Sequence, residues 1–175
     1  MNLYLIRHTK VDINPDICYG QSDVELADSF LEEAEIIQKQ LHGKQFDKVF
    51  SSPLSRCRKL SEYLFKSEIK YDNRLMELNF GDWELKKWDN LSGSQFNNWC
   101  TDFVNTSCPN GESFIDLHNR VNDLLNDLKN QSHLNVAIIA HGGVIRSLLV
   151  HIQNKELKDA FKREIKYGEI LNCTL

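Results

Sequence analysis

The first residues that could carry chemistry are Arg7 and His8. They follow the apolar run Leu3–Ile6, which is typical of a strand buried on both faces. A neutral imidazole can act as a nucleophile, and a guanidinium can bind two oxygens of a phosphate at once. From this stretch alone, two polar residues that merely open a loop are an equally good interpretation.

A second stretch of the same design favours the chemical interpretation. The apolar run Asn135–Ala140 ends in His141, and Gly142 and Gly143 follow before a helical pattern begins. Glycines let backbone N–H groups approach an anion closely, and the N-terminus of a helix favours negative charge. Two histidines at strand ends, an arginine and a glycine turn therefore predict a phosphate pocket rather than a metal site.

The pattern along the chain predicts the elements that position these residues. Continuous apolar strands alternate with amphipathic helices, as in an α/β protein with a mostly parallel central sheet and helices on both faces. In such sheets ligands bind beyond the carboxyl ends of the strands, where His8 and His141 lie. We expect a three-layer α/β/α sandwich, in which Glu169–Leu171 supplies an edge strand.

Capping signals place two of the helices between the strands. Ser29 and Glu32 have the spacing of a capping box, and Ser52-Pro53 reads as an N-cap followed by proline at the first helical position. Arg56 would then fall in the first turn, where a positive charge opposes the helix dipole. By itself it reads as a surface arginine, although a bound anion would also explain it.

Length and composition narrow the class of protein. A chain of 175 residues with a net charge of −4 fits a single domain, residues 1–175, and carries no basic signature of nucleic-acid binding. No apolar run is long enough to cross a membrane, and Leu3–Ile6 is too short for a signal peptide, so we expect a cytoplasmic protein. The oligomeric state stays open between monomer and homodimer. The five cysteines are scattered, without zinc spacing, and we expect reduced thiols.

Residues 73–111 form the least regular part of the chain and hold all three tryptophans, Trp83, Trp88 and Trp99. One interpretation is a satellite cluster that packs an insertion onto the core. The other is an aromatic wall or lid over a flat organic substrate. The two interpretations are compatible.

Four motifs occur in an order that resembles the histidine phosphatase superfamily, also called the phosphoglycerate mutase-like family. They are Arg7-His8-Thr9, Ser51 to Cys57 around Arg56, Glu77 before Phe80-Gly81, and His141-Gly142-Gly143. Residues 18–26 and 75–84 are most similar to the α-ribazole phosphatase branch. This resemblance implies removal of the 5′-phosphate of α-ribazole 5′-phosphate, in the synthesis of the lower ligand of cobalamin.

The resemblance also implies roles for single residues. His8 would be the nucleophile that forms a phosphohistidine, and Glu77 would protonate the leaving oxygen and then activate water. The remaining residues would bind the phosphoryl group or the substrate: Arg7, Arg56, His141, Asn14, Gln21, Thr9 and the Gly142 backbone. From the residues alone, Asn14 beside a proline is more often a turn residue. Because arginines and a histidine supply the positive charge, we expect no metal and no cofactor.

Two departures from the family pattern are visible. Thr9-Lys10 replaces the usual Gly-Glu after the Arg-His pair, and residues 28–30 lack the common Pro-Ala-Gly turn. Alternatives to the α-ribazole assignment are a broad-specificity phosphatase, a phosphohistidine phosphatase acting on a protein, and a phosphoglycerate mutase. The short insertion after Glu77 speaks against the mutase. A non-enzymatic alternative is that the pocket binds a phospho-ligand or phosphoprotein without turnover.

Overall fold

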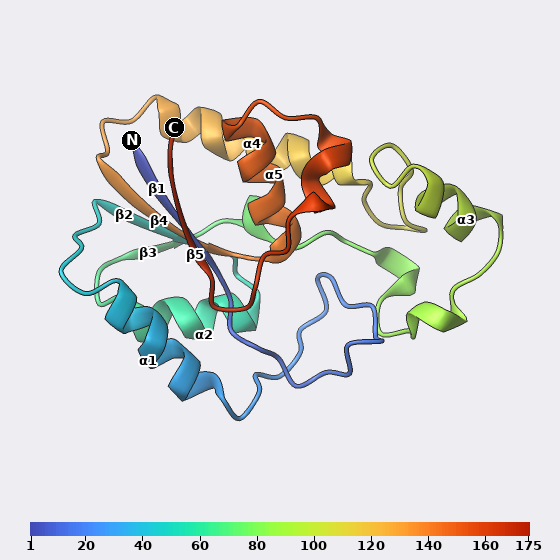
Figure 1. The fold of residues 1–175 in the computed structure, drawn as a ribbon, viewed down its shortest axis with the longest axis horizontal. Coiled ribbons are helices and arrows are strands. Elements are labelled where there is room, and N and C mark those ends of the chain that lie inside the picture. The colour runs from blue at the N-terminus through green and yellow to red at the C-terminus, as the bar shows by residue number, and fades with distance from the viewer.

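A five-stranded sheet runs through the centre of the computed structural model, which describes residues Met1–Leu175 (Figure 1). Its strands are β1 (Asn2–Arg7), β2 (Lys48–Ser51), β3 (Ile69–Tyr71), β4 (Asn135–Ala140) and β5 (Ile170–Thr174). They lie in the order β3-β2-β4-β1-β5, with β5 antiparallel to β1 and all other pairs parallel. The expected fold class is confirmed, including the C-terminal edge strand.

Helices cover both faces of this sheet (Figure 1). Helices α1 (Phe30–Gln40) and α2 (Ser55–Leu64) lie on one face, and α4 (Phe114–Lys129) and α5 (Gly142–Ile152) lie on the other. Successive side chains of a strand point to opposite faces, so β1 sends Leu3 and Leu5 into the core under α4 and α5. Tyr4 and Ile6 enter the core under α1 and α2. The sheet is thus buried on both sides, as its continuous apolar strands predict.

The strand register gathers the polar residues at one edge of the sheet. Arg7 is paired with Ala140, so His8 and His141 follow on neighbouring strands, and the His8 amide donates to the Ala140 carbonyl at 3.1 Å. On the other side of β4, the Ser52 amide donates to the Ile139 carbonyl at 2.9 Å. Three strand ends therefore converge where the sequence predicts a pocket.

Two of the expected helix caps are wrong in detail, although α1 does begin directly after Ser29. The Ser29 side chain caps no backbone amide and instead donates a hydrogen bond to the Glu33 carboxylate. Helix α2 begins at Ser55, with Leu54 rather than Ser52 at its N-cap. Both differences arise because serine hydroxyls bond to whichever acceptor or donor is nearest, and spacing alone does not fix that choice.

The segment from residue 73 to 111 extends beyond the sheet, with α3 (Ser94–Thr101) at its far end (Figure 1). It also holds three short 3₁₀ turns, Asn73–Leu75, Gly81–Trp83 and Trp88–Asn90; a fourth, Leu157–Lys162, follows α5. Backbone hydrogen bonds tie it to the loop after β1, between Cys18 and residues Leu85 and Lys86. None of the helices is long and apolar enough to cross a membrane.

Candidate active site

His8 lies at the carboxyl end of β1 and is 2% exposed. Its Nδ1 atom is 2.7 Å from the Thr9 carbonyl oxygen, which can only accept a hydrogen bond. Nδ1 therefore carries the proton and Nε2 keeps its lone pair. His8 borders a cavity of about 240 Å³, so this lone pair is available to a molecule bound there.

The surroundings of His8 keep it neutral. Burial lowers the pKa of the imidazole well below 6.5, and the positive charges of Arg56 and Arg7 lower it further. The hydrogen bond to Thr9 acts in the opposite direction but does not prevail. At neutral pH the ring is therefore uncharged, beside two guanidiniums.

Arg56 is fully buried, against the expectation of a surface arginine. Its Nη1 donates to the Ser22 carbonyl at 3.0 Å and its Nη2 to the Gly20 carbonyl at 2.6 Å. Its Nε donates to Nδ1 of His141 at 3.2 Å. These bonds account for a buried cation in the first turn of α2, since several oriented acceptors compensate the lost hydration.

His141 holds Arg56 in position through a hydrogen bond. Because Arg56 Nε only donates, Nδ1 of His141 accepts, and the proton on Nε2 is donated to Oγ of Ser52 at 2.8 Å. The ring is fully buried, 5.1 Å from the His8 ring between centroids, and burial with the charge of Arg56 lowers its pKa well below 6.5. Both nitrogens have protein partners, and the ring is not part of the cavity wall.

Arg7 approaches the cavity from β1. Its Nη1 donates to the Ile165 carbonyl, and its guanidinium lies 3.9 Å from the centre of the Tyr167 ring. Its Nε is buried without a hydrogen-bond partner. Such a donor is costly unless something binds it, so it marks a place for an acceptor such as a phosphoryl oxygen.

Glu77 faces His8 across the cavity from the irregular segment. Its carboxylate accepts hydrogen bonds from the Gly143 amide at 3.0 Å and the Leu78 amide at 2.9 Å. A β-carbon at Gly143 would overlap this carboxylate, which explains why a glycine stands there. The Glu77 carbonyl accepts from the Gln21 side-chain amide and from Arg120. Side chain and backbone of Glu77 are thus fixed together.

Aromatic side chains form much of the remaining wall. Its apolar and aromatic members are Pro15, Ile17, Tyr19, Leu78, Phe80, Trp88, Phe114, Phe161 and Tyr167. Trp83 is buried and packs against Phe96 and Trp99, away from the cavity. The tryptophan-rich segment therefore packs a satellite cluster and also supplies Phe80 and Trp88 to the pocket wall; its role over a flat substrate stays a prediction.

Not all of the candidate residues border the cavity. Arg7, His8, Arg56, Glu77 and Gly142 do. Besides His141, three candidates do not. Asn14 is exposed, and its side-chain oxygen accepts from the Asp16 amide, as in an ordinary turn. Gln21 supports the Glu77 backbone, and Thr9 is buried with an unpartnered hydroxyl.

Three residues at the site escape the sequence argument: Tyr19, Tyr167 and Arg146. The two tyrosine hydroxyls lie 2.8 Å apart, so they join the loop after β1 to the loop before β5 beside the cavity. Neither loop carries a signal that predicts this meeting. Arg146 stands in the sequence four residues after Gly142, one helical turn away, and that spacing could have indicated it.

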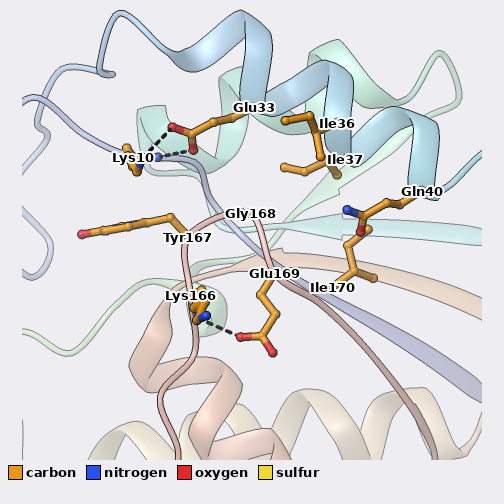
Figure 2. Close-up of a pocket in the computed structure, with 10 residues that line it drawn as sticks. All are labelled: Lys10, Glu33, Ile36, Ile37, Gln40, Lys166, Tyr167, Gly168, Glu169 and Ile170. Atoms are coloured by element: carbon orange, nitrogen blue, oxygen red, sulfur yellow. Dashed lines mark hydrogen bonds and ion pairs between the residues drawn. The ribbon is translucent and has the colours of Figure 1, made fainter.

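A wider cleft of about 500 Å³ lies on the other side of Tyr167 from the cavity beside His8, between α1 and the loop before β5 (Figure 2). Lys10 and Tyr167 lie at one end of it, and Gln40 and Ile170 at the other. Its carboxylates already have protein partners: Glu33 pairs with Lys10, and Glu169 accepts from the Lys166 amide and from Arg163. Tyr167 separates this cleft from the cavity beside His8.

The sequence and the fold of this chain are similar to those of known proteins. Residues 3–174 match the model of the histidine phosphatase superfamily (branch 1). A protein of Hydrogenobacter thermophilus named "Putative phosphoserine phosphatase 2" is 30% identical over 154 residues, covering 84% of this chain and 76% of that protein. The adenosylcobalamin/alpha-ribazole phosphatase of Escherichia coli K12 is 29% identical over 160 residues, covering 87% of this chain and 79% of that one.

A solved structure has the same fold over nearly the whole chain. The alpha-ribazole phosphatase of Shigella flexneri superposes with a TM-score of 0.91 at 25% identity, covering 98% of this chain and 89% of that chain. According to their names, these three relatives are phosphatases of different phosphate esters, and a further relative, 28% identical over 158 residues, is named a probable phosphoglycerate mutase, so the names do not fix the substrate.

Proposed function

The chain belongs to branch 1 of the histidine phosphatase superfamily, and from this premise we propose that it hydrolyses small phosphate monoesters through a phosphohistidine at His8. One observation carries the proposal: His8 is buried, its Nδ1 proton is held by the Thr9 carbonyl, and Nε2 is left free at a cavity that Arg7 and Arg56 border. This is the arrangement that an in-line attack on phosphorus requires.

In the first step Nε2 of His8 attacks the phosphorus atom, and the bond from phosphorus to the ester oxygen breaks. The leaving oxygen takes the proton of the Glu77 carboxyl and departs as an alcohol. Guanidiniums fixed before the reaction stabilise the charge on the transferring phosphoryl oxygens without reorganising. The positive charge needed there comes from Arg7 and Arg56, so the proposed reaction uses no metal ion. No cluster of three or more histidine, cysteine, aspartate or glutamate side chains is arranged to hold one.

In the second step a water molecule attacks the phosphohistidine from the side that the alcohol has left. Glu77, now a carboxylate, accepts the water proton as the bond from phosphorus to Nε2 breaks. Inorganic phosphate leaves, and His8 and Glu77 return to their starting protonation states. The backbone amides of Leu78 and Gly143 hold the carboxylate during this step.

Two substrate classes have support, and one of them is α-ribazole 5′-phosphate. Support comes from the alpha-ribazole phosphatase relative at 29% identity and from the aromatic wall with Phe80 and Trp88, which suits a flat heterocycle. A phosphate ester of a small acid, such as phosphoserine, is the second candidate. It is favoured by the 30% identical relative and by Arg146, a third arginine at the cavity.

The test is phosphate release, measured with a chelator present, from p-nitrophenyl phosphate and from a panel of both substrate classes. The wild-type protein should be active and His8→Ala inactive. His42→Ala is the control and should behave as wild type, because His42 is exposed and does not border the cavity. With p-nitrophenyl phosphate, whose leaving group departs without a proton, Glu77→Gln should still form the phosphoenzyme but hydrolyse it slowly, and rapid quenching in alkali should trap this acid-labile species.

Two other outcomes would contradict the proposed phosphatase function. Transfer of phosphate between 2- and 3-phosphoglycerate would make the protein a mutase. Binding of these esters without release of phosphate from any of them would mean a phospho-ligand binding module instead.

A further inference from the structure

Arg146 is a cation of the cavity that forms no ion pair within the protein, although the charges of Glu77 and Glu164 act on it from a distance. It lies in the second turn of α5, and its guanidinium takes part in no hydrogen bond or ion pair within the protein; its Nε is buried without a partner. The guanidinium stacks on the exposed Phe161 ring, with Cζ 4.9 Å from the ring centre. Arg146 and Phe161 both border the cavity beside His8.

The other inward-facing arginines are anchored. Arg120 bonds to the Glu112 carboxylate and to three backbone carbonyls. Arg56 bonds to two carbonyls and His141, and Arg7 bonds to the Ile165 carbonyl. A half-buried guanidinium without such partners has lost hydration that stacking on Phe161 replaces only in part, unless a ligand supplies the acceptor. Burial accordingly lowers the pKa of Arg146, although it stays protonated.

Arg146 stands beside the place where the phosphoryl group would bind. A β-carbon built on Gly142 would lie 2.8 Å from Nη1 of Arg146 and 3.6 Å from Cζ of Arg7. The two guanidiniums thus flank the first residue of α5, so an anion held by Arg146 would neighbour one held by Arg7. This spacing suits two anionic groups a few bonds apart on one small molecule.

The charges of the cavity wall lead to the same conclusion. Three arginines border it, Glu77 is its only acidic residue, and both histidines are neutral. In the state that donates a proton, Glu77 is uncharged as well, and the wall then carries three positive charges. A phosphate monoester dianion balances two of them. One positive charge remains for a second anionic group.

We propose that Arg146 binds a carboxylate of the substrate and thereby selects phosphate esters of small hydroxy or amino acids. The inference rests on the proposed phosphatase function and names its substrate class. The cavity volume of about 240 Å³ agrees with it, because pockets for larger ligands typically measure about 300–1,000 Å³.

Two pairs of substrates that differ only in the carboxylate test this proposal. They are phosphoserine with phosphoethanolamine, and 3-phosphoglycerate with glycerol 3-phosphate. Wild-type kcat/KM should be higher for the carboxylate member of at least one pair. Arg146→Gln should lower kcat/KM for that member by about 10- to 100-fold, mainly through KM, since a charge-assisted bond contributes about 1.5–3 kcal/mol. The partner without the carboxylate should change less than about 3-fold, and Arg146→Lys should restore part of the loss.

The outcomes separate the two proposals. No hydrolysis of p-nitrophenyl phosphate by the wild-type protein would overturn the proposed function itself. Intact hydrolysis with no preference for a carboxylate, or an equal loss on both members of a pair in Arg146→Gln, would overturn only the role of Arg146. Activity of Arg146→Gln on p-nitrophenyl phosphate and an unchanged Tm identify a folded variant. Arg58→Gln, on the exposed side of α2, is the matched control for removing an arginine charge.

Discussion

The His8 and His141 rings are neighbours, but their ring nitrogens form different hydrogen bonds. His8 gives only Nδ1 to the protein, at the Thr9 carbonyl, while His141 gives Nδ1 to Arg56 and Nε2 to Ser52. A proton added to either ring would place a charge beside Arg56 in a buried site. Hence one imidazole is left free to react, and the other holds the guanidinium that would stabilise the reacting group.

Arg56→Lys should cost both activity and stability, because one ammonium group cannot reach the acceptors that three guanidinium nitrogens serve. We expect kcat on p-nitrophenyl phosphate to fall by about 10²- to 10³-fold. The free energy of unfolding should fall by about 1–3 kcal/mol. Arg58→Lys, two residues on and paired with Glu62 at the surface, should change neither. Equal kinetics in both variants would remove Arg56 from the reaction.

The pH profile should report the neutral state of His8. Burial first, and then the charges of Arg56 and Arg7, lower the pKa of His8 well below 6.5, so the reactive neutral form persists below pH 6.5. The acid limb of kcat/KM should therefore lie below that value. Arg7→Met removes one of these charges and should move the limb toward higher pH, whereas Arg7→Lys keeps the charge and should leave it in place. An acid limb that does not differ between the two variants would contradict this assignment.

Among the helices, α4 carries the cap that the sequence argument sought at α1. Ser113 accepts from the Asp116 amide, and the Asp116 carboxylate accepts from the Ser113 amide, which closes a capping box. Ser113→Ala should lower the free energy of unfolding by about 1 kcal/mol. Ser29→Ala should cost less, because its hydroxyl bonds to the Glu33 side chain and caps no amide. Urea titrations of both variants measure the difference, and a larger loss at Ser29 would refute it.

How far the sequence predicts an element depends on how local its cause is. Strands β1 and β4 are evident because each is a continuous apolar run that ends in a histidine. The three-residue β3, Ile69–Tyr71, goes unnoticed because its residues are exposed or half-buried and only its pairing with β2 makes it a strand. The capping pattern at Ser29 fails for a related reason, since the Ser29 hydroxyl is oriented toward the Glu33 carboxylate and accepts from no backbone amide.

The same holds for the site. His8, Glu77 and Arg7 are found from motifs, and the strand register then brings His8 and His141 together. The burial of Arg56 could not be predicted, because its acceptors, the carbonyls of Gly20 and Ser22, belong to a loop about thirty residues earlier. That loop is in turn held by the Glu84 carboxylate through the Gln21 and Ser22 amides. Contacts this distant in sequence leave no periodic trace.

In the molecule as a whole, the cavity forms where separate parts of the chain meet over the edge of the sheet. The sheet ends supply His8 and Arg7, the loop after β1 supplies Tyr19, the irregular segment supplies Glu77 and Trp88, and α5 supplies Arg146. The two apolar cores lie to either side of the sheet and fix its position. Movement of the loops would thus change the walls of the pocket without moving His8.

The buried histidines should also make global stability depend on pH. Burial lowers the pKa of His8 and His141 below 6.5, so below that pH the unfolded chain binds protons that the folded protein excludes. Their contribution to stability is complete above pH 6.5 and is lost as the pH falls. From pH 7.5 to 5.5, each should cost about 1.4 kcal/mol in free energy of unfolding. The lowered pKa values of His118 and His151 act in the same direction, whereas the carboxylates of Asp72 and Glu84, with ordinary values of 3.8 and 4.5, matter only in more acidic solution.

Urea titrations at both pH values should find a smaller pH dependence in His8→Asn than in wild type, and an unchanged one in His42→Asn. A stability that does not fall in this window would mean that the folded protein takes up the protons, and His8 would then not be the neutral nucleophile that the mechanism requires.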